Sequence, residues 1–186
     1  MDYRIHILGA SGSGKTTLAH ILSERLNIPH FDTDDYRWVK TTIPYTEKTD
    51  ESKRSEALKT DLLKYPQWVL SGSMPGWGDF AITMFTLGVF LWVPTDLRLS
   101  RIHKRDVERY GLYAISPGGW FHRQHEEFMS GESAYDRAGT DVSYSRAYQE
   151  QWASRVSCPV LKIEGEFSTE ELSAKVEHEL NIMEHN

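Results

Sequence analysis

The feature that most constrains this chain is a glycine-rich loop close to its N-terminus. Residues 9–16 read Gly-Ala-Ser-Gly-Ser-Gly-Lys-Thr and match G-x-x-x-x-G-K-[ST], the phosphate-binding P-loop motif. Residues 3–8 ahead of the loop alternate like a β-strand, and apolar residues recur at helical spacing over residues 15–26 behind it. Strand, loop and helix in this order let backbone N–H groups converge on phosphate oxygens at the positive end of a helix. The motif therefore predicts that the chain binds a nucleoside triphosphate.

Each polar position of the loop has an expected task. Lys15 would reach the β- and γ-phosphates, and the Thr16 hydroxyl would bind Mg²⁺. The alternative for these letters is a glycine turn without a ligand, which the flanking strand and helix disfavour. ATP and Mg²⁺ are thus the expected cofactors. The residues expected to hold the phosphates are Gly9, Ser11, Gly12, Ser13, Gly14, Lys15, Thr16 and Thr17.

The rest of the chain alternates between apolar strand-like segments and helical segments. Strands are expected at residues 3–8, 28–31, 68–70, 87–93 and 160–163. Helices are expected at residues 15–26, 51–64 and 95–110, and after Ser168, where Ser-Thr-Glu-Glu forms a capping box. Alternating strands and helices imply a parallel sheet with helices on both faces. We therefore predict the α/β fold of a P-loop NTPase, with three layers, a five-stranded parallel sheet and a small lid at about residues 110–140, in a single domain over 1–186.

Composition limits the partners and the compartment. The formal net charge is −6 without any basic block, so nucleic acid is not an expected partner. The longest apolar run, residues 87–93, is too short to cross a bilayer, and the first residues do not resemble a signal peptide. Cys158 is the only cysteine and cannot form an intramolecular disulfide. These features predict a cytoplasmic protein without a membrane partner; the oligomeric state stays open.

A cluster of carboxylates follows the second expected strand, in the sequence Asp32-Thr33-Asp34-Asp35. Ligands of such sheets bind beyond the carboxyl ends of the strands, so these groups should lie near the P-loop. Asp32 and Asp34 would project to the same side if the strand extends to them. One could hold Mg²⁺ through water, and the other could accept a hydroxyl proton or fix a substrate hydroxyl. The alternative is a helix N-terminus, where acidic residues are favoured by the helix dipole.

The expected helix at residues 95–110 carries a basic stripe. At 100° per residue, four arginines lie within about 80° of one another: Arg98, Arg101, Arg105 and Arg109. One face with four arginines is typical of a surface that binds phosphate. The alternative is a solvated face that pairs with Asp106 and Glu108. Glycines and a proline over residues 111–119 would hinge the lid.

Two further segments leave their roles open. Trp77, in the shaped loop after the third expected strand, would either stack on a ligand ring or anchor the loop in the core. The helix over residues 51–64 is expected to bury Ala57, Leu58, Leu62 and Leu63. Residues 132–155 are polar and aromatic, and their pattern assigns them no chemistry.

Taken together, these motifs resemble the adenylate-kinase-like group of P-loop kinases, which includes nucleoside monophosphate, shikimate and gluconate kinases. Residues 7–19 are similar to the small-metabolite kinases, and Asp32-Thr33-Asp34 is similar to the Asp-x-Asp of shikimate kinase. This resemblance implies that Asp32 serves the magnesium ion and Asp34 the acceptor hydroxyl. It also implies that residues 165–167 contact the adenine. The chain further resembles bacterial P-loop proteins labelled kinases or ATPases, some of them with a DNA-topology label.

The resemblance does not extend to the acceptor. Ser71-Gly72-Ser73 stands where adenylate kinase has Asp-Gly-x-Pro-Arg and shikimate kinase has three glycines. The expected function is therefore transfer of the γ-phosphoryl group of ATP to a small-molecule acceptor, through a hydroxyl. Alternatives are a nucleoside or nucleoside monophosphate kinase and a nucleotide-dependent regulatory ATPase. The expected catalytic residues are Lys15, Asp34, Arg105 and Arg109, with Arg101 at the phosphates and Thr16 and Asp32 at the metal.

Overall fold

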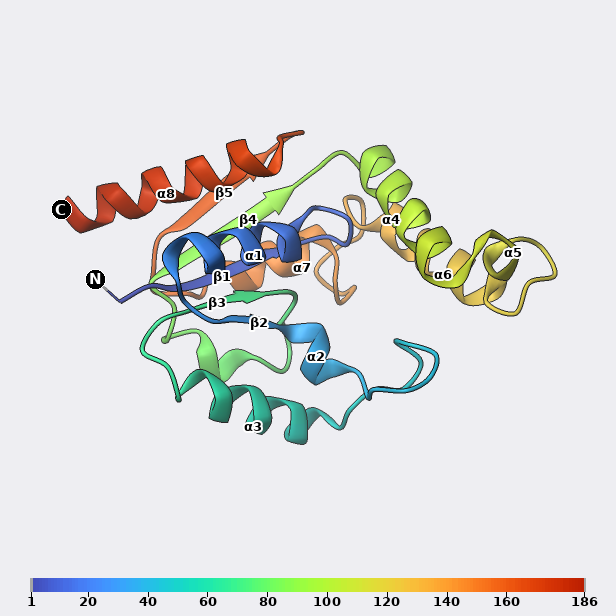
Figure 1. Ribbon diagram of the computed structural model, residues 1–186, viewed down its shortest axis with the longest axis horizontal. Coiled ribbons are helices and arrows are strands. Elements are labelled where there is room, and N and C mark those ends of the chain that lie inside the picture. The colour runs from blue at the N-terminus through green and yellow to red at the C-terminus, as the bar shows by residue number, and fades with distance from the viewer. Residues whose placement is uncertain (1, 186) are drawn as a thin grey trace.

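Five strands form one parallel sheet in the order β2-β3-β1-β4-β5 (Figure 1). The computed structural model describes residues 2–185. The strands are β1 Arg4–Gly9, β2 His30–Asp32, β3 Trp68–Ser71, β4 Leu87–Trp92 and β5 Val160–Glu164. Because β1 pairs with both β3 and β4, it lies in the middle of the sheet, and the loop that follows it emerges at the centre of the strands' carboxyl edge. The predicted five-stranded parallel sheet is confirmed.

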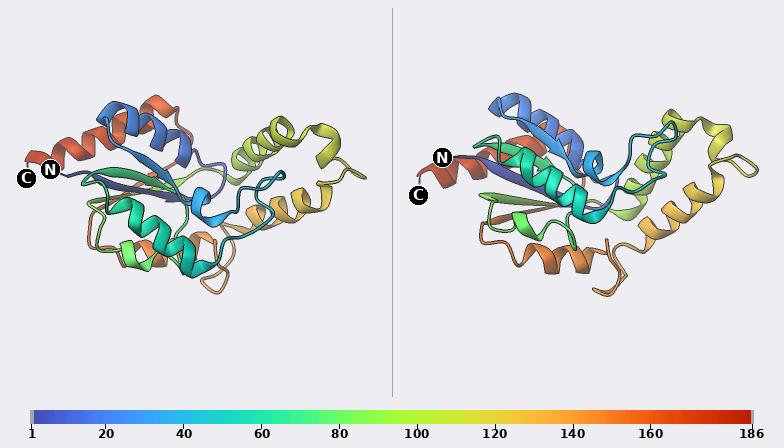
Figure 2. Two further views of the ribbon diagram at one scale, coloured as in Figure 1. Left: turned by 60° about the horizontal axis from the view of Figure 1, so that its bottom comes forward. Right: turned by 90° about the horizontal axis from the view of Figure 1, so that it is seen from below.

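Helices cover both faces of this sheet. They are α1 Lys15–Leu26, α2 Thr33–Arg37, α3 Glu51–Leu62, α4 Thr95–Tyr110, α5 Leu112–Ile115, α6 His122–Ala134, α7 Arg146–Ala153 and α8 Thr169–His185, with a short 3₁₀ turn, η1, at Asp79–Ala81. Helices α1 and α8 lie over one face, and α3, η1 and α7 lie over the other (Figures 1 and 2). The three predicted layers are therefore present. None of the helices in residues 2–185 has the length and apolar character needed to span a membrane.

Alternation along the central strand divides the core in two. Ile5 and Ile7 pack with α1 and α8, whereas Leu8 packs on the opposite face with α3 and α7. This is the period of two that a strand buried on both faces requires. Leu8 directly before the P-loop and Leu18 shortly behind it belong to these clusters, so both ends of the loop are anchored in the core.

The ends of α3 and α8 show how local sequence sets the layers. The predicted capping box forms at α8: Glu171 N donates to Ser168 Oγ at 3.2 Å, and Ser168 N donates to the Glu171 carboxylate at 2.8 Å. In α3, Leu58 and Leu62 are buried as expected, but Ala57 is exposed, and so is Leu63 just after the helix. The third buried position is Arg54, whose guanidinium lies over the Trp77 ring. The inward face of α3 is thus spaced by four residues, which turns residue 57 to the outside.

The elements α4, α5 and α6, at residues 95–134, form a helical arm. It extends beyond the carboxyl edge of the sheet, on the side of the P-loop (Figures 1 and 2). Gly111 and Gly118 flank α5 with φ values of 84° and 86°, in the left-handed region that favours glycine. The arm includes most of the segment predicted as a lid; that it closes over the site stays a prediction.

A buried histidine gives the core a defined pH dependence. His6 on β1 is 1% exposed and stacks on Phe85, with ring centroids 4.7 Å apart. Its Nε2 lies 3.0 Å from the Gly72 carbonyl oxygen and, since a carbonyl only accepts, carries the hydrogen. Burial lowers the pKa of His6 from 6.5 to about 4. The unfolded chain therefore takes up a proton below pH 6.5 that the folded chain excludes until about pH 4.

We expect His6→Gln to resist acid better than the wild type. Glutamine keeps an N–H donor for the Gly72 carbonyl but does not titrate. Between pH 6.5 and pH 4, the free energy of unfolding should fall by about 3 kcal/mol less in the variant. Urea denaturation at both ends of this range measures the difference. Parallel pH–stability curves for the two proteins would contradict this account of His6.

Candidate active site

One pocket gathers the motifs that the sequence singled out. It encloses about 490 Å³ at the carboxyl edge of the sheet, between the P-loop, α2, α4 and the start of α8. Of the expected site residues it includes Ser11, Gly12, Ser13, Gly14, Lys15, Thr16, Thr17, Asp32, Asp34, Arg101 and Arg105. Elements distant in the sequence thus meet at one concave surface, as expected for a ligand site in a parallel sheet.

The P-loop adopts a conformation that depends on its glycines. Gly12 has a φ of 76°, and a Cβ there would lie 2.7 Å from the Arg98 carbonyl oxygen. Gly14 has a φ of 93° and caps α1, so the free N–H groups of the helix's first turn face the pocket. The buried hydroxyl of Ser13 has no hydrogen-bond partner within the described residues. A cradle of N–H groups with an unpartnered hydroxyl fits the phosphate groups of ATP.

Gly9 does not line the pocket, and its backbone conformation has a structural cause. Its φ is 142°, and a Cβ would lie 2.2 Å from the Leu91 carbonyl oxygen on the neighbouring strand. Close backbone packing at the end of β1, rather than contact with a ligand, therefore accounts for this glycine.

We expect Gly12→Ala to damage both the loop and its function. An alanine here must adopt a left-handed backbone conformation, and its methyl group must displace the backbone of α4 at Arg98. A destabilisation of about 2 kcal/mol and a marked loss of ATP affinity are expected. Thermal melting and calorimetric titration with ATP measure the two effects. Gly131→Ala on α6, where a Cβ meets nothing within 4 Å, is the control and should be neutral or slightly stabilising. A Gly12→Ala protein with wild-type stability and ATP affinity would contradict this geometry.

Lys15 stands at the first turn of α1 with its amine turned back onto the loop. Its Nζ donates to the Ala10 carbonyl at 2.7 Å. Removal from water lowers the pKa of Lys15, while the carboxylates of Glu132, Asp34 and Asp32 act in the opposite direction. The amine is thus a half-buried donor surrounded by acidic groups, and an incoming phosphate can compete for it.

The two aspartates after β2 occupy different positions. Asp32 ends β2 and caps α2: its Oδ1 accepts from Asp34 N at 2.9 Å, and its Oδ2 accepts from Thr16 Oγ1 at 2.9 Å and Ser71 Oγ at 3.0 Å. The strand does not extend to Asp34, which lies in the first turn of α2, because the chain turns helical at Thr33. The alternative of a helix N-terminus is therefore correct, yet both carboxylates line the pocket. Burial and the nearby Asp32 raise the pKa of Asp34.

Hard oxygen ligands for a magnesium ion are present at this point. The Thr16 hydroxyl donates a hydrogen bond to the Asp32 carboxylate, and both residues line the pocket. Oxygen donors of this kind, completed by phosphate oxygens and water, are the usual surroundings of Mg²⁺ beside a nucleotide. Within residues 2–185 no group of three or more histidine, cysteine, aspartate or glutamate side chains could hold a metal ion.

The basic stripe on α4 is divided by the fold. Arg101 and Arg105 line the pocket, and Arg101 Nη1 donates to the Gly12 carbonyl at 3.4 Å. Arg98 is fully buried and forms salt bridges with Glu132 and Asp136, so its predicted phosphate-facing position is wrong. Arg109 is exposed outside the pocket, with its guanidinium 4.7 Å from the Tyr45 ring centroid. The stripe therefore offers two arginines to a ligand in this conformation.

The structure also shows where Trp77 and the segment expected to contact adenine lie. Trp77 is buried in the core with its Nε1 donating to the Ser73 carbonyl, so it is an anchor. Phe167 lines the pocket from the segment expected to contact adenine, whereas Gly165 and Glu166 do not. Gly72 lines the pocket from the loop after β3, and three further lining residues were not predicted: Ile102, Thr169 and Leu172. The capping box at the start of α8 signals a helix but no ligand site, and the side of α4 that carries Ile102 has no motif, so only the tertiary structure brings these residues here.

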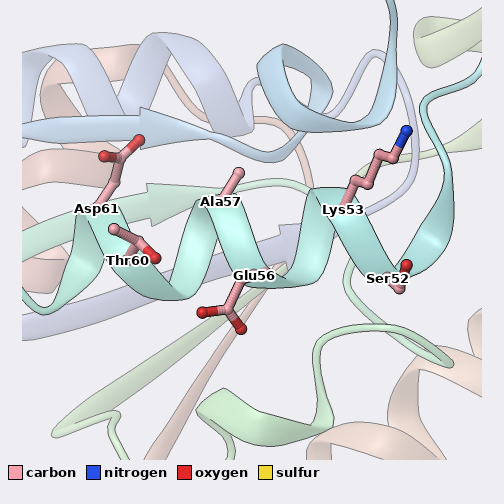
Figure 3. Close-up of a pocket in the computed structure, with 6 residues that line it drawn as sticks. All are labelled: Ser52, Lys53, Glu56, Ala57, Thr60 and Asp61. Carbon is pink, nitrogen blue, oxygen red and sulfur yellow. The ribbon is translucent and has the colours of Figure 1, made fainter.

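A second hollow, on the outer face of α3, lacks such chemistry (Figure 3). All of its lining residues come from that one helix: Ser52, Lys53, Glu56, Ala57, Thr60 and Asp61. Their side chains point in different directions, and Asp61 is already bonded to Tyr36 and Lys64. The pocket at the P-loop is therefore the candidate active site.

Known protein families agree with this assignment of the fold. A family model described as an AAA domain matches residues 5–116, from β1 to just beyond α5. The chain belongs to this AAA domain family. The AAA domain match includes the P-loop, both aspartates and all of α4.

Individual relatives extend the likeness beyond the AAA domain match. The chain is 44% identical over 171 residues to the uncharacterized protein YqaC of Bacillus subtilis, covering 92% of this chain and 93% of that protein. It is 50% identical over 50 residues to an adenylate kinase of Ruminiclostridium cellulolyticum, 26% of this chain and 23% of that enzyme.

Solved structures show the same fold. A shikimate kinase from Acinetobacter baumannii, in complex with shikimate, is similar with a TM-score of 0.55 and 15% identity, over 97% of this chain and 93% of that one. A shikimate kinase from Bacteroides thetaiotaomicron has a TM-score of 0.54 and 15% identity, over 96% and 98% of the two chains. At this identity the likeness shows the fold alone, and it confirms the predicted P-loop kinase-like architecture.

Proposed function

We propose that this protein transfers the γ-phosphoryl group of ATP to a hydroxyl group of a small-molecule acceptor. The observation that carries the proposal is the meeting of the P-loop lysine, Asp34 and Arg105 in one pocket of about 490 Å³. Phosphoryl transfer requires a phosphate cradle, a group that orients the nucleophile and positive charge for the transition state. Each of these functions has a candidate side chain here.

The side chains divide the task as follows in this proposal. The loop N–H groups and Lys15 hold the phosphates, while Thr16 and Asp32 hold Mg²⁺, which neutralises charge on the phosphate oxygens when bound. Asp34 orients the acceptor hydroxyl and accepts its proton. Arg101 and Arg105 stabilise the charge that develops on the transferred group. Arg109 would join them only if the helical arm closed as a lid, which would also exclude water.

A second candidate is a nucleoside monophosphate kinase. The 50-residue match to an adenylate kinase favours it, because it combines high identity with the same class of fold. Against it, neither Trp77 nor Tyr36 lines the pocket, because Trp77 is buried and the Tyr36 ring packs against the core under α3. The acceptor therefore separates the two candidates.

An acceptor screen tests the proposal. Purified protein with Mg·ATP would be assayed for ADP release across nucleoside monophosphates, nucleosides, sugar acids, polyols and shikimate. We expect release to rise with one chemical class of hydroxyl compound. Stimulation by nucleoside monophosphates alone would favour the second candidate. Slow release that no acceptor changes would point to a nucleotide-dependent regulatory ATPase instead.

A further inference from the structure

Glu132 of α6 brings a carboxylate onto the P-loop. Its Oε1 accepts from Ser11 Oγ at 2.7 Å, and its Oε2 lies 3.2 Å from Arg98 Nη1. The Glu132 side chain is only 14% exposed. Among the carboxylates that act on the Lys15 amine, Glu132 acts most strongly, ahead of Asp34 and Asp32. A helix of the arm thus places a negative charge on the loop whose lysine would hold the phosphates.

The neighbouring arginine does not cancel this charge. Arg98 is shared, because its Nη2 also pairs with Asp136 at 3.1 Å. Of the two carboxylates that share Arg98, only Glu132 also bonds to the loop, through Ser11. An acidic group in contact with an anion-binding loop repels an incoming anion and so weakens its binding. We therefore expect the Glu132 carboxylate to influence which anion the loop binds.

We propose that Glu132 is a specificity-determining residue of the phosphate site, whose carboxylate competes with the terminal phosphate of a nucleoside triphosphate for Lys15. Lysine in this motif reaches the β- and γ-phosphates, so a carboxylate that acts on its amine opposes the end of the phosphate chain. Repulsion then weakens the binding of a triphosphate more than that of a diphosphate. The inference rests on the proposed function in that the loop must bind a nucleotide.

Glu132→Gln isolates the charge. Glutamine has the same shape and keeps an oxygen to accept from Ser11, and Arg98 keeps Asp136 as a partner. We expect the Kd for Mg·ATP to fall about tenfold, and the Kd for Mg·ADP to fall clearly less. Isothermal titration calorimetry with each nucleotide measures both constants, and thermal melting verifies that the variant is folded.

Two matched variants separate charge from structure. Asp136→Asn removes the other carboxylate of Arg98, one helical turn away, where Asp136 bonds to Trp92 and Thr95 instead of the loop. It should leave the ratio of the two affinities unchanged. Glu132→Asp keeps the negative charge and should retain the wild-type ratio.

Any one of three results would overturn this inference but not the proposed function. They are an unchanged ratio of the ATP and ADP affinities in Glu132→Gln, weaker ATP binding in that variant, or the same shift in Asp136→Asn. In each case the wild type would still bind both nucleotides through Lys15. Wild-type protein that bound neither nucleotide would overturn the proposed function, and this inference with it.

Discussion

Lys15→Ala is expected to abolish phosphoryl transfer and leave the fold intact. The amine is the one cation that the P-loop motif itself supplies, and removing such a charge from a transition state lowers the rate about a thousandfold or more. The fold should survive because the amine makes a single hydrogen bond, to the Ala10 carbonyl of its own loop. ADP formation and thermal melting measure the two effects.

The control for this variant is Lys53→Ala. Lys53 is exposed on the outer face of α3, away from the pocket. It should retain wild-type turnover. Turnover that persists in Lys15→Ala would contradict the assignment of the P-loop as the site of phosphoryl transfer.

Asp34→Asn is expected to lower turnover about a hundredfold or more while the Kd for ATP changes little. Asparagine has nearly the same shape but cannot accept the hydroxyl proton. The Lys15 amine donates to the Ala10 carbonyl, and the Asp34 carboxylate acts on it through space alone, so the phosphate site should keep its geometry and the change in ATP affinity should be far smaller than the loss of rate. Steady-state rates at saturating acceptor, together with titration of ATP, separate the two quantities.

Asp35→Asn provides the matched comparison. Asp35 is the adjacent carboxylate on α2, is exposed and does not line the pocket. Its replacement should leave both the rate and the ATP affinity unchanged. Equal losses of rate and ATP affinity in Asp34→Asn would argue against a role at the acceptor.

The sheet and the P-loop could be predicted from sequence because their signals are local. Ile5 and Ile7 alternate with Leu8 as a strand buried on both faces requires, and the capping box at Ser168 fixes the start of α8 within one residue. The P-loop motif specifies a strand, a turn and a helix within one contiguous stretch, residues 4–26. These patterns need no knowledge of distant partners.

The division of the arginine stripe could not be predicted in this way. Angles along α4 group Arg98 with Arg105, but they do not say which of them meets another helix. Arg98 is buried because it pairs with Glu132 and Asp136. These partners lie 34 and 38 residues further along the chain. Glu132 itself reaches Ser11 across 121 residues. Buried charge networks of this kind depend on tertiary packing and leave no spacing signal in the sequence.

The most direct test of the central claim is a phosphorus balance. The protein would be incubated with Mg·ATP and the acceptor that most increases ADP release, and phosphorus NMR would quantify ADP, inorganic phosphate and any new phosphoester. A kinase of the proposed kind should form ADP and phosphorylated acceptor in equal amounts, with little inorganic phosphate. ADP and inorganic phosphate in equal amounts, without a phosphoester, would contradict transfer to an acceptor.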